Sequence, residues 1–289
     1  MEQYVIPTII LLLIAVTVTA FVLAAVRKRK RYDKDLTFPD APPRTDLLYG
    51  YYACNNGQAY EVAGHVNLHF ESQFEGQDKA IENIVKMART TILDLSAQLF
   101  EKVGDAKVFT LRASALRDVT VFMRRLAEAG ALQHVKYIYP IDEPNATVGD
   151  VAVLDAAVEL VIMAAQQFPA LDGVKLAVIY AANSEFIGQE LFSLVGFDDY
   201  DMASHVLTSD KYLKLKDSLQ PGQRTIIVPG GAYGQHPRPF MDFANGNEEV
   251  AVVMPFIWFD DTTGTAQVKG IRSSPLKEAY IAAGLSVIA

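Results

Sequence analysis

Two adjacent carboxylic acids, Asp142 and Glu143, stand directly after a short run of aliphatic and aromatic residues, Val135–Ile141. Repulsion between neighbouring carboxylates disfavours the ionisation of both, and partial burial raises a carboxyl pKa. One of the two acids can therefore stay protonated near neutral pH while the other stays ionised. This pair predicts general acid/base chemistry, with Glu143 and Asp142 as catalytic residues.

Further polar residues follow other apolar runs. Asp199 lies in the acidic segment after the run Leu194–Phe197, and we expect it to act as an additional catalytic carboxylate. Trp258 is the only tryptophan, and we expect its flat apolar face to stack on a ligand ring. The complete set of expected substrate-binding residues is His69, Glu71, Tyr139, Asp198, Tyr200, His236, Trp258 and Asp260.

Two runs carry a strict alternation of polar and apolar residues. In His65–Phe74 the polar residues, from His65 to Glu71, share one face of the expected strand, and we expect that face to look into the centre of the fold. On this face His65 and Asn67 are expected to make structural hydrogen bonds. In the run Ile92–Leu99, Asp94 lies early in the expected strand, which favours a structural carboxylate.

Eight short apolar runs, separated by stretches of helical period, predict strictly alternating strands and helices. The runs are Leu47–Cys54, His65–Phe74, Ile92–Leu99, Val135–Ile141, Lys175–Ala181, Leu194–Phe197, Arg224–Pro229 and Val250–Trp258. The clearest expected helices are Gln77–Arg89, Ala115–Ala129 and Val148–Phe168, the last capped by Thr147. Such alternation implies a parallel sheet with right-handed crossovers. Eight repeats in about 240 residues match the usual size of a (β/α)8 TIM barrel, in which reactive residues lie at the C-terminal ends of the strands. The runner-up is an open doubly wound sheet, but no Gly-rich phosphate turn follows the first run.

The layout and several strand endings together resemble barrel glycoside hydrolases over residues 47–289. The endings are Asp142-Glu143-Pro144 in the fourth run, Gly196-Phe197-Asp198-Asp199-Tyr200 in the sixth and Ile257-Trp258 in the eighth. In the large retaining clan the fourth strand ends in Asn-Glu-Pro, so the resemblance gives Glu143 the acid/base role, with Asp142 replacing the Asn. That clan also has a nucleophilic Glu at the end of the seventh strand, where this sequence has Val228-Pro229-Gly230-Gly231.

This departure favours a resemblance to the barrel hexosaminidases, in which an adjacent Asp-Glu pair works with the 2-acetamido group of the substrate. On that resemblance Asp142 orients and polarises the acetamide, and Glu143 is the general acid/base. An alternative pairs Glu143 with Asp199 or Glu71 across the barrel as acid and base. All three arrangements imply a carbohydrate substrate.

Two other function classes remain open at this stage. One is a catalytically silent barrel that binds a saccharide or a protein partner at the membrane. The other is a metal-dependent hydrolase that uses His69, Glu71, Asp142 and His236. These four residues lack a recognised ligand spacing, so we expect neither a metal ion nor another cofactor.

The N-terminal part predicts a single transmembrane helix. Residues 5–26 carry no charge, and at about 1.5 Å per residue they are long enough to cross a bilayer core. Five basic residues follow at 27–31, so 1–31 form the expected anchor and 32–46 a proline-containing linker to the barrel domain, 47–289. Positive charge after the span favours a cytoplasmic barrel, whereas a glycan as substrate favours the exterior.

Composition narrows the partners further. The chain carries a net charge of −8 at pH 7, and no cluster mixes basic and aromatic residues, so we expect no nucleic-acid partner. The single cysteine, Cys54, excludes a disulfide within the chain.

Overall fold

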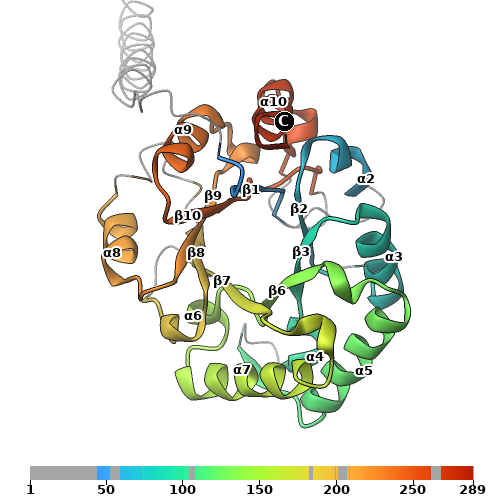
Figure 1. Ribbon diagram of the computed structural model, residues 1–289. Coiled ribbons are helices and arrows are strands. Elements are labelled where there is room, and N and C mark those ends of the chain that lie inside the picture. Colours follow the sequence, from blue (N-terminus) through green and yellow to red (C-terminus); the bar gives the residue numbers. More distant parts are fainter. Residues whose placement is uncertain are drawn as a thin grey trace, which may run out of the picture. The chain divides into compact units, whose positions relative to one another are not determined.

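The structure is a computed structural model that describes residues 44–52, 59–73, 75–103, 108–181, 185–198, 200, 207, 209–261 and 268–288. Within these residues eight parallel strands form one sheet in the order β1-β10-β9-β8-β7-β6-β3-β2. Figure 1 shows the strands as a ring with helices around the outside. The strands are β1 (Leu48–Tyr49), β2 (Leu68–Glu71), β3 (Thr90–Asp94), β6 (Val135–Tyr139), β7 (Lys175–Ala181), β8 (Leu194–Asp198), β9 (Arg224–Val228) and β10 (Val250–Val253). The predicted (β/α)8 barrel is thus confirmed, and each of the eight apolar runs overlaps one of its strands.

An asparagine side chain joins the first and second strands of the ring. The backbone N–H of Asn67 donates to the Tyr49 carbonyl (3.1 Å), and the Asn67 side-chain oxygen accepts from the Tyr49 N–H (2.7 Å). The Asn67 side-chain nitrogen donates to the Leu47 carbonyl (3.0 Å). These bonds satisfy backbone groups that the short strand β1 would otherwise leave unpaired. Asn67 therefore has the structural role expected from the sequence.

Helices cover the outside of the barrel. They are α2 (Ala59–Val62), α3 (Gln77–Met87), α4 (Ser96–Leu99), α5 (Ala115–Glu128), α6 (Pro144–Thr147), α7 (Val151–Ala165), α8 (Asp210–Ser218), α9 (Arg238–Gly246) and α10 (Lys277–Ile288). Of the expected helices, 77–89 and 115–129 correspond closely to α3 and α5. The third begins later than expected, because Asp150 caps α7 by accepting from the Ala152 N–H, while Thr147 ends the separate turn α6.

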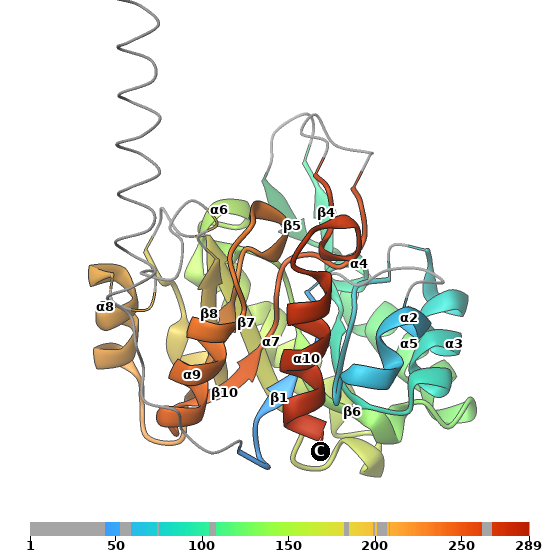
Figure 2. The ribbon, with the colours of Figure 1, turned by 90° about the horizontal axis from the view of Figure 1, so that it is seen from above.

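An antiparallel hairpin of β4 (Phe100–Lys102) and β5 (Phe109–Leu111) follows β3 and α4. Figure 2 shows this hairpin and α6 at the same end of the barrel, the end at which the strands finish. The run Ile92–Leu99 is consequently not one strand, because it turns into α4 after Asp94. Asp94 lies at the end of β3 and not early in it, so the sequence-based position of this carboxyl was wrong.

The barrel interior is filled by apolar residues of alternating strand positions. Leu68 and Phe70 of β2 belong to one buried cluster with Ile179 and Ile226 of strands across the ring. The expectation that the polar face of β2 looks inward was therefore wrong. The interior of a closed barrel is a packed core, so the apolar face of β2 fills it and His69 and Glu71 face the helix layer.

Arg44 is the first described residue, and its guanidinium makes several hydrogen bonds at the N-terminal ends of the barrel strands. One of its nitrogens donates to the carbonyls of Ala244, Asn247 and Val250 at 2.7–2.9 Å. The rest of the group pairs with Asp46, which also pairs with Arg224. The expected membrane span, 5–26, lies outside the described residues. Within the described part of the chain, no helix is long and apolar enough to cross a membrane.

The contact between β1 and β2 leaves no room for a side chain at Gly50. A Cβ there would lie 2.5 Å from the Leu68 carbonyl oxygen. We expect Gly50→Ala to lower the free energy of unfolding by about 1–3 kcal/mol, because the two segments must move apart. Thermal and urea unfolding of the variant measure this. Gly246→Ala is the matched control, since a Cβ at Gly246 meets no atom within 4 Å. An equal effect of the two substitutions would contradict the close contact.

Candidate active site

Two tyrosines hold the Asp142 carboxylate at the open end of the barrel. The hydroxyl of Tyr139, the last residue of β6, donates to Asp142 Oδ1 at 2.6 Å, and the Tyr52 hydroxyl donates to the same oxygen. The surrounding protein raises the pKa of Asp142, and the two hydroxyl groups partly offset this rise by stabilising the charged form. Asp142 as a residue is exposed at the open end, although burial of its carboxyl group is the main cause of the raised pKa.

Glu143 follows in a strained backbone conformation. Its φ of 45° lies in the left-handed region, which costs a non-glycine residue about 1–3 kcal/mol. Neighbouring bonds fix this turn: the Glu143 N–H donates to the Ile179 carbonyl of β7 (3.1 Å), and the Thr147 hydroxyl donates to the Glu143 carbonyl (2.9 Å). Backbone strain of this kind clusters at functional sites, so it is consistent with a functional role for Glu143.

The Glu143 side chain meets the carboxyl group of Asp198, the last residue of β8. The Glu143 carboxyl group lies close enough to Asp198 to raise the pKa of Asp198, which favours a proton on one of the two groups. Burial and the charge of Glu143 raise the pKa of Asp198 to about 7, while the nearby Tyr200 hydroxyl opposes the rise. The structure thus provides a carboxyl pair that holds one proton near neutral pH.

Asp94 is a further acid at this end of the barrel, and it is buried. Burial raises its pKa to about 7, and the charges of Asp142 and Glu71 add to the rise. The Ser96 N–H (2.7 Å) and hydroxyl (2.6 Å) both donate to Asp94 Oδ1 and stabilise the ionised form. With Asp142, Glu143 and Asp198, Asp94 makes four carboxyl groups on or directly after the ends of β3, β6 and β8.

Glu71 and His69, both expected in the substrate site, belong to a buried network behind β2. His69 Nε2 lies 2.9 Å from Glu71 Oε2, which also accepts from the Asn83 amide of α3 (3.2 Å). The other Glu71 oxygen accepts from the Gln73 N–H (3.1 Å). All of these groups are at least nine-tenths buried. Glu71 therefore links β2 to α3 and is not opposite Glu143 in the mouth.

Trp258 does not offer the open ring face that the sequence predicts. Its side chain is only 2% exposed and packs against Tyr51 and His65, with ring centroids 4.9 and 5.4 Å away. Its indole N–H donates to Glu61 (2.9 Å) of α2. Trp258 faces outward because its neighbour Ile257 fills the barrel interior. It therefore packs the helix layer against the barrel.

The remaining expected residues have different positions. Asp260 accepts from the Gly270 N–H (2.8 Å) and the Ser273 hydroxyl (2.7 Å) and lies beside Arg272, so it orders the loop after β10. His236 is exposed, and its ring Nδ1 accepts from the Arg238 N–H. Asp199 lies outside the described residues. No group of three or more metal-ligating side chains occurs in the described part of the chain.

The segment directly after β9 carries two glycines, Gly230 and Gly231, and no carboxylate. A Cβ at Gly230 would lie 3.2 Å from the Gln235 side chain and 3.3 Å from the Tyr200 ring. At Gly231 a Cβ would lie 2.4 Å from Ile271. The buried Gln235 amide fills this place, accepting from the Gly230 N–H (2.6 Å). A glutamate at either glycine would require these neighbours to move.

Sequence reasoning missed Tyr52 and Gln235 and misplaced Asp94. Strand alternation was the available signal for Tyr52, since Leu48, Gly50 and Tyr52 share the inward face of the first run. Gln235 had no such signal, because its position depends on the turn after β9.

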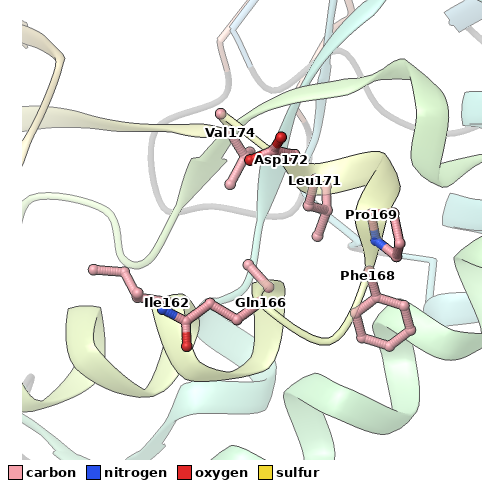
Figure 3. A pocket seen from close by; sticks show the side chains of 9 residues that line it. Ile162, Gln166, Phe168, Pro169, Leu171, Asp172 and Val174 are labelled. Carbon is pink, nitrogen blue, oxygen red and sulfur yellow. The ribbon is translucent and has the colours of Figure 1, made fainter.

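A separate hollow of about 450 Å³ lies at the other end of β7, between the end of α7 and the segment 168–174 that precedes the strand. Figure 3 shows Gln166, Phe168 and Asp172 among its lining residues. It shares no lining residue with the carboxyl cluster, so the two sites are separate.

Comparison with known proteins supports the fold. No protein-family model matches the sequence, and no curated protein is significantly similar to it. Among solved structures, a β-glucuronidase from Ruminococcus gnavus in complex with D-glucaro 1,5-lactone has a TM-score of 0.53 at 12% identity, covering 82% of this chain and 49% of that one. A β-glucuronidase from Bifidobacterium dentium complexed with coumarin-3-O-glucuronide gives 0.53 at 11% identity, covering 85% and 46%. The chain thus spans about half the length of these enzymes, and the likeness shows a common barrel fold.

The raised pKa of Asp94 predicts a pH-dependent stability. Its pKa in the folded chain, about 7, lies above the usual 3.8, so the folded state binds the proton more tightly than the unfolded state. The free energy of unfolding therefore falls as pH rises from about 4 to 7 and stays low above that. We expect Asp94→Asn to remove this loss and to stabilise the protein at pH 8 by at most about 4 kcal/mol.

Urea unfolding of Asp94→Asn and the parent protein between pH 4 and 8 measures the difference. Asp172→Asn, an exposed position at the opposite end of the barrel, is the control. A stability difference for Asp94→Asn that does not grow with pH would refute the assigned ionisation.

Proposed function

We propose that the chain is a membrane-anchored, glycoside hydrolase-like barrel that hydrolyses a glycan. Glu143 is the general acid/base, and Asp142 is the partner that orients the substrate. The observation that carries the proposal is the carboxyl pair of Glu143 and Asp198, which holds a proton near neutral pH beside the tyrosine-bound Asp142. Glycoside hydrolysis requires a protonated acid at the leaving oxygen and a second group at the anomeric carbon.

The reaction follows from these positions. Glu143 donates its proton to the glycosidic oxygen as the bond between that oxygen and the anomeric carbon breaks. Asp198 supports this step because it shares the proton with Glu143 and so keeps a protonated carboxyl present near pH 7. In the second step Glu143 accepts a proton from water, the water oxygen bonds to the anomeric carbon, and the bond between that carbon and the nucleophile of the first step breaks.

The nucleophile of the first step is best supplied by the substrate. A side chain at Gly230 or Gly231 would require neighbouring side chains to move, which disfavours a protein nucleophile at the end of β9. A 2-acetamido group can attack the anomeric carbon through its carbonyl oxygen. Asp142 suits the role of accepting the acetamide N–H, because the two tyrosines fix one of its oxygens and the residue is accessible.

The two similar solved structures are β-glucuronidases. We transfer from them only the class of substrate, a glycoside, since the likeness is limited to the barrel. A second carboxylate in the role of base could come from Asp198 or from Asp199, because Glu71 is committed to the network behind β2.

Replacement of Glu143 tests the assignment. Glu143→Gln keeps the shape of the side chain and removes its proton, so we expect kcat on 4-nitrophenyl 2-acetamido-2-deoxy-β-glycosides to fall about 10²–10⁴-fold. Release of 4-nitrophenol measures the rate. Glu190→Gln, an exposed position, is the control and should retain the parental rate.

Undiminished turnover in Glu143→Gln would overturn the proposed role of this residue. A parent protein that binds oligosaccharides without hydrolysing them would instead identify a catalytically silent saccharide-binding barrel. Calorimetry on the same preparations separates the two results.

Membrane attachment is tested independently of catalysis. We propose that residues 5–26 span the bilayer, so the full chain should sediment with membranes and resist carbonate extraction, whereas a chain lacking residues 1–31 should remain in the supernatant. If the chain lacking residues 1–31 still sedimented with membranes, residues 5–26 would be excluded as the sole anchor. Protease treatment of intact cells then assigns the side: cleavage of the barrel domain places it outside, and protection places it in the cytoplasm.

A further inference from the structure

Three aromatic rings form a stack beside the carboxyl pair. Tyr200 stacks on Phe256, with ring centroids 4.7 Å apart, and on Tyr233, 5.2 Å away. The rings of Tyr233 and Phe256 are parallel within 8°. They come from the loops after β8, β9 and β10, so three strand ends support one aromatic surface.

The stack is continuous with the proposed catalytic groups. The Tyr200 hydroxyl lies close enough to Asp198 to affect its pKa, and its own pKa is raised by burial first and then by the charge of Asp198. Tyr52, which donates to Asp142, packs against Phe256 with centroids 5.8 Å apart. A ligand ring on this surface would therefore lie next to a ring held by Asp142 and Glu143.

Tyr233 is the member of the stack that a ligand can reach. Its side chain is 48% exposed, whereas Trp258 is only 2% exposed. The Tyr233 ring packs nearly parallel to both Tyr200 and Phe256, and about half of the residue is accessible to solvent. The C–H groups on one face of a pyranose ring pack well against such a surface, because the ring face is apolar and carries negative charge density.

The charge of the same loops indicates which sugars fit. The segments 50–58, 72–76, 140–149, 182–193, 199–209 and 229–237, which follow six of the strands, contain no lysine or arginine, whereas the segments after β3 and β10 do. They contribute Asp142 and Glu143 to the cluster, and the end of β8 contributes Asp198. A sugar with its own carboxylate would face several like charges, and Lys211, the cation beside the ends of β7 and β8, already donates to the Ala181 carbonyl (3.3 Å) and lies over the Phe186 and Phe197 rings.

We propose that the Tyr233–Tyr200–Phe256 stack is a subsite for an uncharged sugar ring adjacent to the reacting ring, and that this site discriminates against sugars carrying a carboxylate. The inference rests on the proposed function, and it adds to it the position of a second sugar and the charge class of the substrate. Tyr233 supplies the contact surface, and Tyr200 and Phe256 hold it in place.

Calorimetric titration with two oligosaccharides tests this subsite. The full chain carrying Glu143→Gln, which slows hydrolysis, is titrated with chitotriose and with trigalacturonate. We expect chitotriose to bind at least about tenfold more tightly than trigalacturonate. Adding Tyr233→Ala should weaken chitotriose binding by about tenfold or more, and Tyr233→Phe should retain the parental affinity.

Leu213→Ala is the matched control, because Leu213 is 46% exposed on α8 and should leave binding unchanged. Parental chitotriose affinity in Tyr233→Ala, equal or tighter binding of trigalacturonate, or no binding of chitotriose would each overturn the subsite. Turnover of aryl glycosides that depends on Glu143 would in that event leave the proposed hydrolase function standing. If the proposed function itself were wrong, turnover would not depend on Glu143, or the parent protein would show no turnover.

Discussion

Repulsion among crowded carboxyl groups is the constraint on which the open end of this barrel depends. Asp94, Asp142, Glu143 and Asp198 come from strand ends that the fold brings together, and burial removes much of the water that would screen them. Each acid has its own compensation: serine donors for Asp94, tyrosine hydroxyls for Asp142, and a shared proton for Glu143 and Asp198. Without these partners the cluster would favour an expanded or unfolded chain.

The hydrogen-bond partners of each acid also indicate which chemical role the acid suits. The Ser96 donors hold Asp94 beneath the surface, and its backbone carbonyl accepts from the Gln73 amide, which suits a structural group. Asp142 is fixed through one oxygen and stays accessible, so it can still bind a ligand. The proton shared by Glu143 and Asp198 is the one that a substrate oxygen could take. The loss of folding stability and the reactive proton thus have the same physical origin: several carboxyl groups lie close together where little water solvates them.

The sequence predicted the barrel correctly because the alternation of strands and helices is a repeated signal that tolerates errors in single elements. It also placed Asp142 and Glu143 at the open end, because they directly follow a strand. Predictions that required a side-chain direction were weaker. Asp94 was misplaced because α4 begins directly after Leu95, and an alternating pattern does not show where a strand turns into a helix. Trp258 faces the helix layer because Ile257 occupies the interior, which depends on the path of the loop after β10.

One packing arrangement accounts for both the departure from two-carboxylate retaining enzymes and the proposed sugar subsite. The end of β9 is made of glycines because Gln235 and the Tyr200 ring occupy the space that a side chain there would need. The same Tyr200 ring supports Tyr233 from beneath. A glutamate at Gly230 would therefore require the Gln235 side chain and the Tyr200 ring to shift. In the proposed reaction the nucleophile therefore comes from elsewhere, and a substrate acetamido group is a source that requires no additional protein carboxylate.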